Sequence, residues 1–69
     1  MDGYERLANE IIILAANDYR RALEGLRKHP YSRAAKKTIK ELEDFFHSDW
    51  YSNLTEVDGE LIIKRIREE

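Results

Sequence analysis

The side chains of this 69-residue chain that could do chemistry are basic, and they gather near its middle. Between residues 20 and 40 the sequence holds eight Lys and Arg residues, against Glu24 as the one acid. From Glu41 to Glu60, with histidine counted as neutral, every charged side chain is acidic. Clustered Lys and Arg bind acidic protein surfaces or phosphate groups. The candidate binding residues in the basic part are Arg20, Arg27, Lys28, Arg33, Lys36, Lys37 and Lys40.

Two interpretations of these basic residues stay open. Arg33, Lys36 and Lys37 would stand in the first turns of a helix that begins after Ser32, where positive charge opposes the helix dipole. A choice that is locally unfavourable and has no visible compensation indicates a functional role. The other interpretation is a solvated surface, partly neutralised by pairs four residues apart along the second helix, such as Lys37 with Glu41.

Ile13 is a candidate for a different kind of contact, because it lies opposite the main apolar stripe of its helix. Its neighbours on a helical wheel are Arg6, Asn9, Asn17 and Arg20. Leu14 and Leu23 widen the apolar stripe on its two flanks, so the middle of the helix is apolar nearly all round. Self-association or the groove of a partner protein would explain this pattern, and so would imprecise helix boundaries.

Residues suited to catalysis or metal binding are few. His29 and His47 are the only histidines, there is no cysteine, and neither an HExxH sequence nor a glycine-rich loop is present. His47 with Asp49 would supply two metal ligands at one corner, fewer than a metal site requires. A chain of this size also has little volume for a sheltered cleft. The sequence therefore predicts a protein that is not an enzyme and has no cofactor.

The elements that must position these residues are helices joined by short turns. The spacing of apolar residues predicts a long helix over about Tyr4 to Lys28, which Pro30 ends because proline cannot donate a backbone hydrogen bond. A second helix follows Ser32, its predicted N-cap, and reaches roughly His47. The short connection between them makes the two helices an antiparallel hairpin.

Two shorter helices are predicted after the hairpin. Ser48 caps a short helical segment that ends near Asn53. Thr55 is the predicted N-cap of the final helix, with Asp58 at the spacing of a capping box. Gly59 lies on the apolar side of that helix, where a glycine lets another backbone come close.

The predicted fold is a single all-α domain over residues 1–69, a small helical bundle made of a long antiparallel hairpin, a short helix and a C-terminal helix. Its core is formed by apolar residues at helical spacing. In the first helix these are Ala8, Ile11, Ile12, Ala15, Tyr19, Ala22, Leu23 and Leu26. In the second and last helices they are Ala35, Ile39, Leu42, Phe45, Phe46, Gly59, Ile62, Ile63 and Ile66. The open end of the bundle is expected to be closed by the rings of Phe45, Phe46, Trp50 and Tyr51.

Composition narrows the class of protein further. A hydrophobic content of 42% argues against intrinsic disorder. The net charge of −2 and the pI near 5.7 make nucleic acid the second choice of partner after protein. The longest apolar run, Ile11 to Ala16, is too short to cross a bilayer, and the start of the chain lacks the basic and apolar segments of a signal peptide. An intracellular protein with no membrane partner is therefore expected.

The chain resembles a family of very short helical proteins encoded by phages and prophages, chiefly of low-GC Gram-positive gut bacteria. The residues that carry the resemblance are Tyr19, Arg20, Phe45, Phe46, Ser48, Asp49, Trp50, Tyr51, Leu54, Thr55, Asp58, Gly59, Glu60 and Ile62. The resemblance implies a mobile-element context, expression in the bacterial cytoplasm and no catalytic residues. Small phage accessory proteins often bind a host machine, so it also suggests a defence inhibitor such as an anti-CRISPR.

Three hypotheses about function follow. The leading one is a non-enzymatic interaction protein that binds a host or phage protein, or a second copy of itself, through the basic residues or the face around Ile13. The second is a small nucleic-acid-binding protein that uses the basic tip of the hairpin, from Arg27 to Lys40. The third is a structural subunit of a phage complex.

Overall fold

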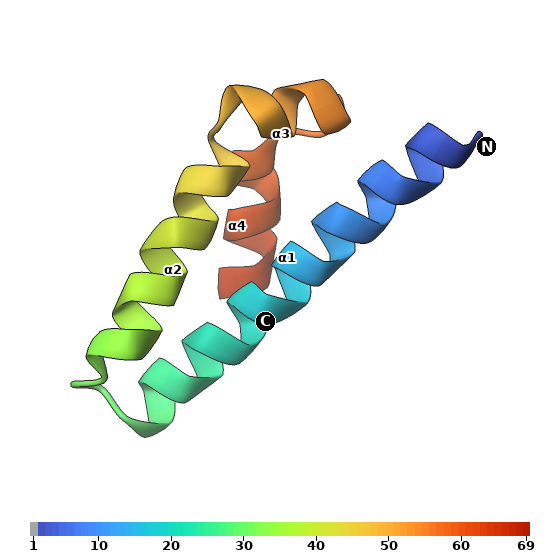
Figure 1. Cartoon of the computed structure of the whole chain (residues 1–69). Coiled ribbons are helices and arrows are strands. Elements are labelled where there is room, and N and C mark those ends of the chain that lie inside the picture. The colour runs from blue at the N-terminus through green and yellow to red at the C-terminus, as the bar shows by residue number, and fades with distance from the viewer. Residues whose placement is uncertain (1) are drawn as a thin grey trace.

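The structure, a computed structural model that describes residues 2–69, consists of helices and short connections, with no strand in that range (Figure 1). The elements are α1 (Gly3–Lys28), α2 (Arg33–Phe46), α3 (Asp49–Leu54) and α4 (Gly59–Arg67). The predicted all-α bundle is therefore confirmed. None of these helices combines the length and the hydrophobicity that spanning a bilayer requires.

Side-chain caps fix where the first three helices begin. Asp2 accepts a 2.8 Å hydrogen bond from the amide of Glu5 at the start of α1. The hydroxyl of Ser32 accepts one of 3.1 Å from the amide of Ala35 and so caps α2. Ser48 caps α3 in the same way, and both serine caps are as the sequence predicts.

The predicted start of the last helix is wrong. Thr55 ends α3, where its extended backbone leaves the helix and its amide donates to the carbonyl of Tyr51. Its hydroxyl accepts from the amide of Val57 in the turn that follows, and the N-cap of α4 is Asp58, which accepts from the amide of Glu60 at 3.0 Å. Thr and Asp are both good caps, so spacing alone does not decide between them.

The close approach predicted at Gly59 is confirmed. A Cβ built on Gly59 would lie 2.8 Å from the carbonyl carbon of Phe46 and would collide with its carbonyl oxygen. The first turn of α4 thus lies directly against the last turn of α2. This contact explains the late start of α4, because the chain must turn between Thr55 and Asp58 before it can return along the hairpin.

One hydrophobic core joins all four helices. Its largest fully buried side chains are Tyr19 from α1 and Phe46 from α2, whose rings meet edge to face with centroids 6.2 Å apart. The other buried members of the core are Ala15, Ala22, Ile39, Tyr51, Ile63 and Ile66. These residues follow the predicted apolar stripes, so the pattern of burial is predicted well by helical spacing.

The aromatic corner at the end of α2 is only partly as predicted. Phe46 and Tyr51 are buried, and Phe45 packs against both, with ring centroids 5.4 and 5.7 Å away. Trp50 contacts the ring of Phe45 but remains 58% exposed, so it covers the corner from outside. The hydroxyl of Tyr51 is buried without a hydrogen-bond partner among the described residues.

The first helix extends well beyond the rest of the bundle (Figure 1). At about 1.5 Å per residue, α1 is roughly 39 Å long and α2 roughly 21 Å. The radius of gyration is 12.7 Å, whereas a compact chain of this length has about 11 Å. The N-terminal half of α1 therefore has much of its surface uncovered, although the hydroxyl of Tyr4 reaches the carbonyl of Asn53 near the end of α3 at 3.4 Å.

Candidate interaction surfaces

The basic tip of the hairpin is largely neutralised within the chain. Arg27 and Lys28 share the carboxylate of Glu24, one turn away on α1. On α2, Lys37 lies 3.9 Å from Glu41 and Lys40 lies 3.1 Å from Asp44. These pairs are exposed and each contributes little to stability, but they reduce the positive potential that the sequence pattern indicates.

Arg33 and Lys36 differ from the other basic residues of the tip. Neither has an ion-pair partner among residues 2–69, and both are exposed in the first turn of α2, which contains no acid. The free positive charge of the tip is therefore concentrated at one turn of one helix. The unpaired basic surface of the tip is therefore smaller than the seven candidate basic residues of the sequence suggest.

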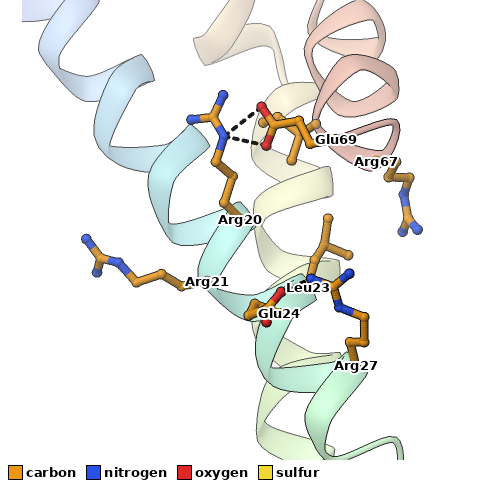
Figure 2. A pocket seen from close by; sticks show the side chains of 8 residues that line it. Arg20, Arg21, Leu23, Glu24, Arg27, Arg67 and Glu69 are labelled. Atoms are coloured by element: carbon orange, nitrogen blue, oxygen red, sulfur yellow. Dashed lines mark hydrogen bonds and ion pairs between the residues drawn. The ribbon is translucent and has the colours of Figure 1, made fainter.

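Arg20 belongs to a different part of the molecule. Its Nε donates to both carboxylate oxygens of Glu69, at 2.8 and 3.0 Å, and so ties the middle of α1 to the end of the chain (Figure 2). Both side chains are about half exposed. The bond lowers the pKa of Glu69 and raises the pKa of Arg20, because it favours the charged form of each.

A groove of about 510 Å³ runs between α1 and α4 beside this ion pair. Figure 2 shows the guanidinium of Arg21 pointing away from it and that of Arg27 folded back over Glu24. Arg67, on the α4 side, is bonded to Glu43. Of the arginines that line this groove, Arg20 alone faces Glu69, so the residues do not converge on one ligand.

A second, apolar groove of about 290 Å³ lies beside the first, also between α1 and α4. We call it the Ile13 groove; its lining residues are Ile12, Ile13, Ala16, Arg20, Ile62, Arg65 and Ile66. Arg20 and Ile66 line both grooves, so the two are neighbours on the surface. Ile13 is 57% exposed and forms part of the wall on α1.

The structure adds a neighbouring helix, α4, to the surroundings predicted for Ile13. The helical wheel of α1 gives Ile13 polar neighbours on its own helix, but it gives no information on α4. Once α4 packs against α1, Ile13 borders a groove whose far side is formed by Ile62 and Arg65. Arg65 is not recognisable as a groove residue from the sequence, where it is only a basic residue in the last turn of a helix that complements the helix dipole.

A further exposed apolar stripe lies on the N-terminal half of α1. Tyr4, Leu7 and Leu14 are all more than half exposed, and the half-buried Ile11 completes a spacing of three, four and three residues. This spacing places the four side chains on one face of the helix. The overhang of α1 beyond α2 leaves this face without cover from the hairpin.

One polar cluster lies between the helices. The hydroxyl of Tyr19 and the guanidinium of Arg67 both bond Oε2 of Glu43. Burial and the neighbouring Glu43 raise the pKa of Tyr19 to about 12, and the same bonds lower the pKa of Glu43. Tyr19 therefore stays protonated and Glu43 ionised at neutral pH, an arrangement that links three helices.

The exposed acid at the edge of the α1 stripe has a local partner. Asp18 pairs with Arg21 at 3.4 Å, one turn further along the helix. Within residues 2–69, no three His, Asp or Glu side chains gather as the ligands of a metal ion would.

Comparison with other proteins adds no relationship. Neither the protein-family models nor the curated proteins nor the solved structures contain a match to this chain.

Proposed function

We propose that this chain is a non-enzymatic protein-interaction module, and that its partner binds in the Ile13 groove between α1 and α4. The observation that carries the proposal is an apolar groove formed by two helices, with an exposed isoleucine on its wall. Burial of apolar surface supplies most of the free energy of protein association.

The groove is a better candidate than the basic tip on energetic grounds. Most cations of the tip already have a carboxylate neighbour, so a partner would have to replace an existing ion pair. An exposed ion pair contributes about 0–1 kcal/mol, and its replacement by another yields little. The apolar side chains of the groove have only water to lose, so their burial is favourable without such an exchange.

The biological setting belongs to the same proposal. The resemblance to phage and prophage proteins supports a partner from the host or the phage, and a defence inhibitor that binds a host protein fits a small chain with an exposed apolar groove. Expression in the bacterial cytoplasm follows from that setting.

Affinity capture from a lysate of Gram-positive gut bacteria tests the proposal. The tagged chain is compared with Ile13→Lys, which places a charge in the groove, and with the control Val57→Lys, which makes the same change at a half-exposed apolar residue in the α3–α4 turn. Circular dichroism establishes that both variants fold. We expect one protein, identified by mass spectrometry, to be retained by the parent chain and by Val57→Lys and lost from Ile13→Lys.

Nuclease treatment of the lysate separates the main alternative. Arg33 and Lys36, which lack a carboxylate partner among the described residues, favour nucleic acid as the second candidate partner. Capture that disappears with nuclease, falls steeply with salt and is indifferent to Ile13→Lys would support that function and overturn the proposed one. Equal retention by all three chains with nuclease present would also overturn the assignment of the groove.

A further inference from the structure

The charged side chains that line the Ile13 groove are of one sign. Its apolar walls are bounded by Arg20 and Arg65, and no acid lines it. On the flank of α1 beyond Ile13 lie Arg6, Asn9, Asn17 and Arg20, together with one acid, Glu10, three residues before Ile13. Around an apolar patch, such a rim selects partners that carry negative charge.

Arg65 strengthens this preference for a negatively charged partner. It is exposed on α4 and has no ion-pair partner among residues 2–69. A neutral apolar partner that filled the groove would remove water from this guanidinium without replacing its hydrogen bonds, which costs free energy. A basic partner would add repulsion, whereas a carboxylate beside the apolar anchor would supply both charge and hydrogen-bond acceptors.

The contact with Glu69 shows that Arg20 can bind a carboxylate in this position. The two carboxylate oxygens of Glu69 lie 2.8 and 3.0 Å from Nε of Arg20 (Figure 2). Arg20 lines both the Ile13 groove and the wider groove. Both side chains are about half exposed, so the pair is weak and open to exchange. Glu69 thus occupies the place that a partner's carboxylate would take.

We infer that the Ile13 groove binds an acidic amphipathic helix of the partner protein, with apolar side chains in the groove and carboxylates on Arg65 and Arg20. The inference rests on the proposed function and names the chemistry of its partner. The two walls are the helices α1 and α4, and a groove between two helices can receive the apolar face of a third. Binding in this position displaces Glu69 from Arg20.

A peptide display library tests this chemistry directly. Its members carry Leu, Ile, Phe or Met at positions i, i+3, i+4 and i+7 of a helix, and Glu, Gln or Lys at the flanking positions. The full chain, Ile13→Lys, Arg65→Glu and Glu69→Gln serve as baits, each checked by circular dichroism. For the parent chain we expect Glu to be enriched over Gln by about three- to tenfold at the flanking positions, as two exposed ion pairs allow.

The variants have distinct expected results. Arg65→Glu should reverse the preference, so that Lys is enriched over Glu at the positions beside it. Glu69→Gln should increase the affinity of synthetic Glu-rich winners about two- to fivefold, because a neutral amide replaces the side-chain carboxylate that competes for Arg20. Ile13→Lys should lose all winners.

The remaining outcomes distinguish the inference from the proposed function. Winners that need Ile13 but show no preference among Glu, Gln and Lys would overturn the acidic partner and leave the groove as the binding site. Winners that bind Ile13→Lys as well as the parent chain would overturn both. If the library yields no peptide that binds with a dissociation constant below about 1 mM, the inference is overturned. The capture experiment decides the proposed function separately.

Discussion

The hydroxyl of Tyr19 donates a 2.5 Å hydrogen bond to Oε2 of Glu43, which lies 24 residues further along the chain. The same carboxylate oxygen accepts a 2.7 Å bond from Arg67, whose guanidinium carbon lies 5.8 Å from the centre of the Tyr19 ring. One side chain from each of α1, α2 and α4 therefore meets at this point. The contact fixes the position of α4 on the hairpin, and with it the walls of the Ile13 groove.

Tyr19→Phe should destabilise the protein although it leaves the buried ring in place. The substitution removes a hydrogen bond to a charged acceptor, and Glu43 keeps only its bond to Arg67. We expect the free energy of unfolding to fall by about 1–2 kcal/mol, measured by urea denaturation followed by circular dichroism. An unchanged urea midpoint would show that the bond to Glu43 contributes nothing net.

Tyr51→Phe should have the opposite result and serves as a matched comparison. Tyr51 is buried, as Tyr19 is. Unlike that of Tyr19, its hydroxyl has no hydrogen-bond partner among the described residues. Removing a buried polar group that lacks a partner relieves its desolvation cost. We expect the free energy of unfolding to stay the same or to rise by up to about 1 kcal/mol in the same assay. A loss as large as that of Tyr19→Phe would indicate an ordered water bonded to the hydroxyl.

The contrast between the two tyrosines shows how far the sequence alone can lead. Helical spacing predicts that Tyr19 is buried, and cap chemistry correctly predicts Ser32 and Ser48 at the helix starts. These features depend on residues a few positions apart. Spacing does not predict that Glu43 and Arg67 reach Tyr19, because that contact depends on how three helices pack in space.

The same limit explains the errors at α4 and at the candidate site. Thr55 and Asp58 offer equivalent caps locally, and the contact of Gly59 with Phe46, which is not local, selects the second. Ile13 was correctly predicted to be exposed, but its groove is created by α4, which the helical wheel of α1 does not include.

Gly59→Ala should be strongly destabilising despite the better helix propensity of alanine. The added methyl group would collide with the carbonyl of Phe46, so α4 would have to move away from α2. We expect a loss of about 1–3 kcal/mol in the free energy of unfolding, the usual cost of overpacking.

Gly25→Ala is the control for this substitution. Gly25 lies inside α1, and no atom lies within 4 Å of a Cβ built on it. Alanine there should stabilise the protein by about 0.5–1 kcal/mol, because the unfolded chain loses freedom and nothing clashes. If both substitutions stabilised the protein, the close packing of Gly59 against Phe46 would be wrong.

The stability of the protein should fall in acid, with Glu43 as a main contributor. The hydrogen bonds from Tyr19 and Arg67 lower the pKa of Glu43 in the folded state, so the unfolded chain binds a proton at a higher pH than the folded one. The stabilisation is therefore complete above the unfolded pKa of about 4.5 and is lost as the pH falls through the folded pKa. Urea midpoints measured from about pH 6 to about pH 3 should decrease steadily, and Glu43→Gln, which cannot titrate but still accepts hydrogen bonds, should flatten that decrease. If Glu43→Gln and the parent chain lost stability equally over this range, the acid sensitivity would have to arise from other carboxylates such as Glu24 and Glu69, whose pKa values are also lowered by arginine partners.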